Sequence, residues 1–312
     1  MLEGRKYFLV AGSESLFPVD LTDVQEKFHR RIQTYYPNDQ VRWVSLVEAR
    51  KGLMQKLEEA RRAFPNAVTV TFSSLYFPWA DCEISANRIV DKERNNLGVG
   101  QRPKAKCLKK QVDEVMQKAG DRPIIILDDT LFKGHTIDYL VEEKGLRINA
   151  AVECFTFPMA IENCKQKGIS VFSVEELQPE DCIDGMPLHD FLPPLPLCGK
   201  VLGLHNADDC EPLIDNDGAS FSFPYLMPWI SPQQVCDWAS IPEEYVVDFS
   251  TFAILQSIEV MNRLKPLGYL TINDMVANKY SLRTSVPYLD GSNPDMNENI
   301  SVMLRECLHL VE

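Results

Sequence analysis

The most informative segment of the sequence is Ile124-Ile-Ile-Leu-Asp128-Asp129-Thr-Leu-Phe-Lys-Gly134-His-Thr136. Its four leading apolar residues predict a strand buried in a parallel sheet, and two adjacent acids follow at the carboxyl end of that strand. A short loop then reaches Gly134 and Thr136, after which a helical pattern begins. Because α/β proteins bind ligands at the carboxyl ends of their strands, the segment predicts a binding site.

The end of this segment is suited to a phosphate. A helix N-terminus offers unpaired backbone N–H groups and the positive end of its dipole. Gly134 allows the backbone to approach an anion closely, and we expect Thr136 to cap the helix and to donate its hydroxyl to the same oxygens. The two acids would repel a phosphate, so they need hydroxyl groups or a metal as partners. The segment therefore predicts a sugar phosphate bound together with Mg²⁺.

Strand-like apolar runs alternate with helical periodicity through the first 175 residues or so. We expect strands at Tyr7–Ala11, Val41–Leu46, Ala67–Phe72, Ile124–Leu127, Ala150–Phe155 and Ile169–Phe172. We expect helices at Leu21–Gln33, Val47–Ala63, Leu108–Ala119, Thr136–Glu143 and Met159–Lys167. This alternation predicts an α/β fold with one doubly wound, mainly parallel sheet.

The pattern changes after residue 177, because prolines interrupt any long helix or central strand. Five of them fall close together, at Pro179, Pro187, Pro193, Pro194 and Pro196. We therefore expect two domains, residues 1–178 and residues 179–312. The second is expected to be a mostly helical and irregular accessory domain, with helices at Phe249–Leu264 and Ile272–Lys279.

The segment around the two acids resembles the phosphoribosyl pyrophosphate motif of type I phosphoribosyltransferases. In that family a hydrophobic strand leads into two acids, four loop residues, a glycine and a threonine or serine. The strands expected after the motif agree with the family in order and spacing, so the resemblance covers roughly residues 105–174. It implies a phosphoribosyltransferase-like, Rossmann-like fold. The sequence departs from the family at Phe132 and Lys133, where small residues are usual.

The resemblance also implies roles for the residues of the motif. Asp128 and Asp129 would be the catalytic acids that hold the ribose 2′ and 3′ hydroxyls, and they would bind Mg²⁺ directly or through water. The 5′-phosphate would be bound by the substrate-binding residues Thr130, Lys133, Gly134, His135 and Thr136.

Two further loops are needed by such enzymes. A pyrophosphate loop has two equal candidates, residues 11–15 after the first expected strand and residues 72–74 after the third. A closing loop is predicted at residues 97–110, where Arg102 and Lys104 are the expected substrate-binding cations. The alternative for this stretch is a solvated loop that runs into the lysine-bearing face of a helix.

Two aromatic stretches could belong to further surfaces. The cluster Tyr76-Phe77-Pro78-Trp79 would either stack on a nucleobase or pack in the core. The strip at residues 220–238 is rich in aromatic residues and proline, and we expect it to cover another surface. That surface would belong either to the first domain or to a second copy of the chain in a homodimer.

Composition narrows the classes of partner. The 312 residues carry 32 Lys and Arg against 45 Asp and Glu, a net charge of −13, which disfavours general nucleic-acid binding. Apolar runs fall short of a membrane span, so no membrane association is expected. Nine scattered cysteines without short paired spacings predict a reduced, cytoplasmic protein.

Two functions are consistent with these features. The first is a Mg²⁺-dependent phosphoribosyltransferase, a glycosyltransferase that moves ribose 5-phosphate to or from a nitrogenous base. The alternative is a non-catalytic sensor or effector on the same fold, which binds phosphoribosyl pyrophosphate or a nucleotide. The large appended segment and the Phe132-Lys133 departure favour the alternative.

Overall fold

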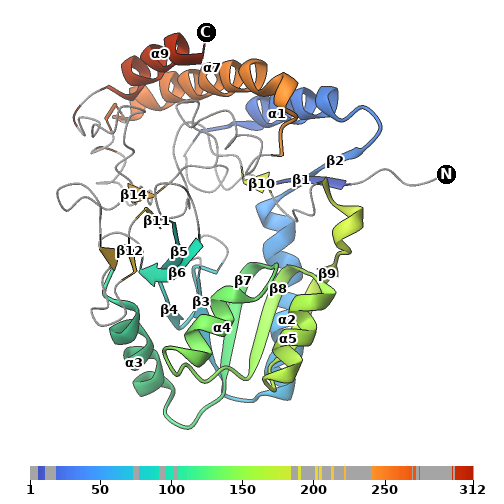
Figure 1. Cartoon of the computed structure of the whole chain (residues 1–312), viewed down its shortest axis with the longest axis vertical. Coiled ribbons are helices and arrows are strands. Elements are labelled where there is room, and N and C mark those ends of the chain that lie inside the picture. Colours follow the sequence, from blue (N-terminus) through green and yellow to red (C-terminus); the bar gives the residue numbers. More distant parts are fainter. Residues whose placement is uncertain are drawn as a thin grey trace. The chain divides into compact units, whose positions relative to one another are not determined.

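The computed structural model divides into two compact units (Figure 1). Unit 1 comprises Met1–Val44, Leu188–Leu202 and Ile214–Glu312, and unit 2 comprises Ser45–Pro187 and Gly203–Leu213. The structure describes residues 6–10, 19–72, 77–90, 96–101, 105–183, 189–190, 201–202, 204–205, 212–213, 221–222, 240–268, 270–271, 274, 297 and 299–311.

This division differs from the expected boundary at residue 178. The first 44 residues group with the C-terminal region instead of with the central sheet. Unit 2 therefore lacks the two strands that the sequence pattern assigned to the beginning of the sheet.

The parallel sheet predicted from the sequence forms the centre of unit 2. Its described strands lie in the order β4–β3–β7–β8–β9, and every neighbouring pair is parallel. These strands are β3 (Val68–Thr71), β4 (Cys82–Glu83), β7 (Ile124–Leu131), β8 (Ala150–Thr156) and β9 (Ser170–Glu176). The α/β prediction is thus confirmed at the level of a parallel sheet with flanking helices.

Helices cover both faces of this sheet (Figure 1). They are α2 (Leu46–Ala63), α3 (Leu108–Ala119), α4 (His135–Glu142) and α5 (Pro158–Gln166). Alternate side chains of β7 point to opposite faces, so Ile124 and Ile126 pack with α3, α4 and α5 in one apolar cluster. Helix α2 packs against β8 and β9 on the other face.

The remaining elements of unit 2 are short. An antiparallel hairpin, β5 (Ala86–Val90) with β6 (Asn96–Gln101), lies between β4 and β7 in the chain. A second small pair consists of β12 (Leu204–His205) and β13 (Pro212–Leu213), and a 3-10 turn, η2 (Pro179–Asp181), follows β9. The sequence pattern predicted neither hairpin.

Unit 1 contains a separate parallel sheet. Strand β1 (Lys6–Val10) pairs with β2 (Gln40–Val44) and with β10 (His189–Asp190). The expectation that the first two strands join the main sheet is therefore wrong. Alternation of strands and helices identifies strands, but long-range pairing decides which sheet they enter. The described residues of unit 1 also include β11 (Val201–Leu202), which pairs with β14 (Phe221–Ser222).

The helices of unit 1 pack through an aromatic contact. They are α1 (Thr22–Tyr35), α7 (Val246–Leu264) and α9 (Ile300–Val311), with the 3-10 turns η4 (Glu243–Tyr245) and η5 (Lys265–Leu267) at the ends of α7. The ring of Phe28 meets that of Phe252 edge to face at 4.8 Å between centroids. The predicted helix at 249–264 is confirmed, while the one at 272–279 lies outside the described residues except for Asp274.

An ion-pair network joins α1 to α7 beside these rings. Arg263 donates two hydrogen bonds of 2.6 Å to the carboxylate of Asp23 and also bonds Glu259. Lys27 donates to Glu259 at 2.8 Å. The Arg263 guanidinium holds the pKa of Asp23 well below its usual range.

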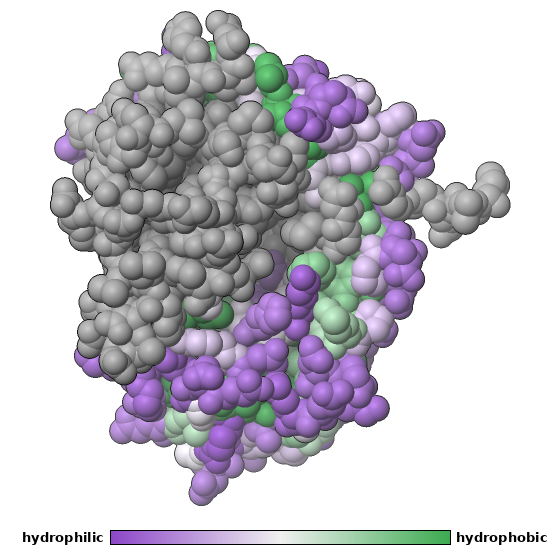
Figure 2. Space-filling model, viewed as in Figure 1, coloured by the Kyte–Doolittle hydropathy of each residue, from purple (hydrophilic) through white to green (hydrophobic). Residues whose placement is uncertain are grey.

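The surface of unit 2 is polar where its helices face solvent. Figure 2 shows mostly hydrophilic residues over α3, α4 and α5 in the lower part of the view. Within the part of the chain that the structure describes, no helix combines the length and the apolar character that a membrane crossing requires.

We predict that Arg263→Gln lowers the free energy of unfolding by about 1 kcal/mol, because it removes the bidentate partner of Asp23 from a partly exposed network. The loss should shrink in 1 M salt, where screening weakens exposed charges. Urea denaturation followed by circular dichroism measures both values. The control Arg30→Gln removes an exposed pair of 3.7 Å and should have no measurable effect. Equal stability of wild type and Arg263→Gln at low salt would contradict the prediction.

Candidate functional site

A cavity of about 310 Å³ lies in unit 2 at the carboxyl edge of the parallel sheet. Its lining begins with Phe72, just beyond β3, and continues along the end of β7. The chain leaves β3 toward β4 on one side and returns to β7 on the other, so the order of strands reverses at this point. Ligands of open α/β sheets bind at such a reversal.

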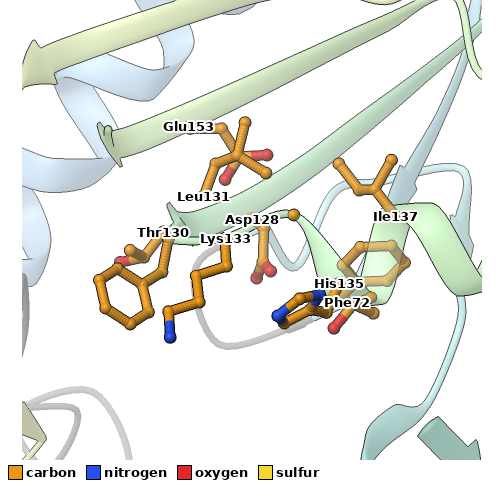
Figure 3. A pocket seen from close by; sticks show the side chains of 11 residues that line it. Phe72, Asp128, Thr130, Leu131, Lys133, His135, Ile137 and Glu153 are labelled. Atoms are coloured by element: carbon orange, nitrogen blue, oxygen red, sulfur yellow. The ribbon is translucent and has the colours of Figure 1, made fainter. Parts of the chain in front are cut away.

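Most of the predicted site residues meet in this cavity (Figure 3). The structure brings together the six residues Asp128, Thr130, Lys133, Gly134, His135 and Thr136. The lining also includes Leu131 and Phe132 of the same loop, and Phe72 from one of the two candidate pyrophosphate loops; Ile137 and Glu153 are the lining residues that the sequence did not predict. The cavity is therefore formed mainly by the motif itself, from the end of β7 to the first turn of α4.

The two acids differ in their relation to the cavity. Strand β7 extends to Leu131, so Asp128 and Asp129 lie within the strand and not after it, contrary to the predicted end at Leu127. Neighbouring side chains of a strand point to opposite faces. Asp128 lines the cavity, and its carboxylate points between Lys133 and His135 in Figure 3, whereas Asp129 is not part of the lining.

Gly134 forms the turn into α4. It is buried and adopts φ +80°, a left-handed conformation that favours glycine, and it is the N-cap residue of the helix. The prediction that Thr136 caps the helix is wrong, because Thr136 is the second helical residue and no side chain caps this end. The first-turn N–H groups lack partners within the helix and lie at the edge of the cavity.

The acid of the first turn is paired elsewhere. Asp138 is half-buried and forms an ion pair of 3.5 Å with Lys167, and it is not among the lining residues. Lys167 also contacts Glu142 at 2.6 Å. The helix therefore keeps its favourable first-turn carboxylate without placing that charge in the cavity.

Phe132 fixes the loop between β7 and α4. Its ring packs edge to face on the buried ring of Phe157, with 5.2 Å between the centroids. The amide of Phe157 also donates to the carbonyl of Leu131 at 3.3 Å. The side chain of Lys133 is exposed, and its ammonium lies 5.5 Å from the centre of the Phe132 ring. The bulky ring thus lines one side of the cavity without closing it.

Glu153 is the residue that sequence reasoning missed. It lies opposite Asp128 in the parallel pairing of β7 with β8, so both side chains lie on the same face of the sheet. Its side chain is 1% exposed and lines the cavity. Neither carboxyl oxygen has a hydrogen-bond partner among the residues that the structure describes. The sequence did contain a signal for this residue, because a glutamate inside the otherwise apolar run 150–155 is unusual for a buried strand.

The surroundings of Glu153 oppose its negative charge. Burial raises its pKa well above the usual range, and the charges of Asp128 and Asp129 raise it further. Burial also raises the pKa of the nearby Cys164 thiol on α5 to about 12, so this neighbour is uncharged. Burial and the neighbouring carboxylates therefore both favour the protonated form of Glu153.

Several predicted features lie outside the described residues. These are Arg102 and Lys104, both candidate pyrophosphate loops apart from Phe72, and most of the strip at 220–238. The predicted closing loop at 97–110 is largely occupied by β6 and α3. Lys106 forms an ion pair with Glu114 of α3 at 2.6 Å, as the solvated-helix alternative expects.

The aromatic cluster before β4 is divided. Phe77 is 1% exposed and belongs to the core, whereas Trp79 is 41% exposed. Their rings meet edge to face at 6.1 Å. Core packing therefore accounts for Phe77, and Tyr76 lies outside the described residues.

The carboxylates of the cavity fit Mg²⁺ as oxygen ligands, but they do not enclose it. Within the described ranges, no group of three His, Cys, Asp or Glu side chains is arranged to hold a metal. Mg²⁺ often binds through one or two carboxylates together with water and substrate phosphates. Asp128 can supply such a carboxylate at the cavity, so the residues present fit a metal that arrives with a phosphorylated ligand.

Comparison with known proteins gives no relative. No family model matches the sequence, and no curated protein or solved structure is similar to it. The functional argument therefore depends on the geometry of the cavity and on the motif.

We predict that Glu153→Gln removes a decline of stability with pH. An unfolded glutamate titrates near pH 4.5, whereas folded Glu153 keeps its proton to higher pH. Between these values the folded state holds the extra proton, so wild-type stability falls as pH rises, with a limiting slope of about 1.4 kcal/mol per pH unit. Urea unfolding from pH 4.5 upward should show that the free energy of unfolding of Glu153→Gln increases relative to that of wild type as the pH rises.

The exposed Glu176→Gln on β9 is the control for this experiment and should follow wild type. Parallel pH profiles for wild type and Glu153→Gln would mean that Glu153 titrates alike in the folded and unfolded chains.

We predict that Gly134→Ala lowers stability by about 1 kcal/mol, because alanine disfavours a positive φ. The matched control is Gly145→Ala, since Gly145 has φ +72° and open space around it. Both variants should lose similar stability in thermal unfolding. Only Gly134→Ala should also lose inorganic phosphate binding, because relaxing its φ turns the N–H groups of α4 away from the cavity. Equal phosphate binding by the two variants would contradict the prediction that phosphate binds at the N-terminus of α4.

Proposed function

We propose that this chain is a phosphoribosyltransferase-like protein that binds phosphoribosyl pyrophosphate or a nucleotide with Mg²⁺. In this proposal it transfers ribose 5-phosphate to or from a nitrogenous base. The observation that supports it most directly is that one cavity combines the carboxylate of Asp128 with the glycine turn and N-terminus of α4. These groups suit the hydroxyls and the phosphate of one pentose phosphate.

The lining divides into two parts of opposite character. Asp128 lies in the second half of β7 and lines the cavity, where a carboxylate can accept hydrogen bonds from sugar hydroxyls. Gly134 and Thr136 lie at the start of α4, where N–H groups and the helix dipole favour a phosphate. Lys133 adds a positive charge beside them. A ligand with hydroxyls at one end and a phosphate at the other would match both parts.

The reaction would be a displacement at the anomeric carbon of the ribose. The bond from this carbon to the pyrophosphate oxygen breaks, and pyrophosphate leaves with the electron pair. A bond to a nitrogen of the base forms, and that nitrogen loses its proton. Mg²⁺, when bound, supplies neutralisation of the pyrophosphate charge. Asp128 would hold the sugar, and the first turn of α4 would hold its phosphate, so that the anomeric carbon is aligned with the base.

One observation favours the non-catalytic alternative. Phe132 lines the cavity at a position where the resembling family usually has a small residue. This departure from the family suits a protein that holds a ligand without turning it over.

One assay distinguishes the two functions. The protein is incubated with phosphoribosyl pyrophosphate, Mg²⁺ and a panel of nucleobases, and released pyrophosphate is measured, while thermal shift reports binding. Turnover with at least one base is the expected result. Binding without turnover across the panel would favour the sensor, and the absence of both would remove the proposal.

We predict that Asp128→Asn weakens binding of phosphoribosyl pyrophosphate by about tenfold or more, because a charged acceptor of the sugar hydroxyls is lost. Asp129→Asn should weaken it less, since Asp129 is not part of the cavity lining. Isothermal titration calorimetry compares the variants with the control Asp121→Asn, an exposed residue in the turn before β7. A larger effect at Asp129 than at Asp128 would contradict this order.

A further inference from the structure

We propose that Glu153 is a ligand-binding residue of this cavity, and that its carboxyl group and that of Asp128 together bind a hydroxyl group of the sugar. The inference rests on the proposed function for the identity of the sugar phosphate. The sequence predicted that the adjacent acids Asp128 and Asp129 contact the sugar. In this inference the contacting acids are instead Asp128 of β7 and Glu153 of the neighbouring strand β8.

The first argument is that Glu153 pairs with nothing in the described structure. The residue is 1% exposed, and both buried carboxyl oxygens lack hydrogen-bond partners among the described residues. A buried polar group without a partner costs stability, so proteins rarely keep one without a use. The hydroxyl of Thr130, on the same cavity, is also buried without a partner in that part of the chain. The carboxyl group of Glu153 and the hydroxyl of Thr130 are therefore available to bind a ligand in the cavity.

The second argument is the position of Glu153 relative to Asp128. Paired residues on adjacent parallel strands stand about 4.8 Å apart, so one hydroxyl group can reach both carboxyl groups. A hydroxyl group donates one hydrogen bond and accepts others. It can donate to either carboxyl group, and it can accept from a carboxylic acid. The arrangement suits a hydroxyl in either protonation state of Glu153.

A cation fits this position less well. Mg²⁺ keeps several waters and an octahedral shell, and the nearly complete burial of Glu153 leaves little room for such a shell. No group of three ligating side chains surrounds the position within the described ranges. A metal brought by the ligand would therefore bind at Asp128, which is less buried than Glu153, and not between the two carboxyl groups.

The size of the cavity limits the part of the ligand that it holds. A volume of about 310 Å³ is at the lower end for small-molecule sites. With phosphate at the N-terminus of α4, the wall formed by Asp128 and Glu153 would meet the ring of a pentose and not a second phosphate. A vicinal diol would bond these two carboxyl groups and the Thr130 hydroxyl.

The test compares wild type, Glu153→Gln and Glu153→Leu by calorimetric titration with ribose 5-phosphate, and with its 2-deoxy and 3-deoxy analogues. Inorganic phosphate is the reference ligand. Glu153→Leu should bind ribose 5-phosphate about tenfold or more weakly than wild type, with phosphate binding unchanged. Glu153→Gln should stay within about threefold, since an amide also donates and accepts. Loss of the hydroxyl that Glu153 binds should weaken binding to wild type more than binding to Glu153→Leu, because the leucine variant has already lost that contact and keeps only the partners supplied by Asp128 and Thr130.

Thermal unfolding of the ligand-free proteins establishes that the variants fold, and Glu153→Ala takes the place of the leucine variant if leucine is not accommodated. Equal affinity of wild type and the apolar variant for ribose 5-phosphate would overturn this inference and leave the proposed function in place. Binding of phosphate but of no sugar phosphate by wild type would overturn both. Mn²⁺ binding to the ligand-free protein that Glu153→Gln abolishes would assign the carboxyl group to a cation and overturn the inference.

Discussion

The pairing of β7 with β8 sets Asp128 and Glu153 against each other on one face of the sheet, and this juxtaposition is the constraint on which the site depends. Two acids on adjacent strands repel each other when both are charged, and the burial of Glu153 leaves no water to reduce that repulsion. The fold therefore favours the protonated form of Glu153 and bears the cost of a buried carboxyl group that has no hydrogen-bond partner among the described residues. A hydroxyl-bearing ligand would reduce that cost, and this links the structure of the sheet to the proposed recognition of a sugar.

The sequence predicted the parts of the motif better than their arrangement. The apolar run before Asp128, the glycine turn and the following helix are local features, and the structure contains each of them. The side-chain cap assigned to Thr136 failed, because Gly134 already forms the turn and no side chain caps the helix. Whether a side chain caps a helix depends on the exact residue at which the helix begins, and a pattern of apolar residues determines that start only to within one or two residues.

Long-range pairing accounts for what could not be predicted. Nothing in the run 150–155 states that Glu153 faces Asp128 and not Asp129, because the register of two strands follows from the packing of the whole sheet. The same limitation applies to β1 and β2, which form strands as expected but belong to a separate sheet, in which β1 pairs with β2 and with β10. The assignment of Arg102 and Lys104 to the site rested on the cations, glycines and proline of that stretch, and it stays a prediction because both residues lie outside the described part of the chain.

The edge-to-face contact of Phe132 with Phe157 has a consequence for the kinetics and the heat of ligand capture. An aromatic anchor in the core orders the connection between β7 and α4 while the chain folds, so the entropy of fixing this connection is part of folding and not of association. Such a preorganised receptor should bind with little change in its backbone, with a small heat-capacity change and at a rate set mainly by diffusion and charge.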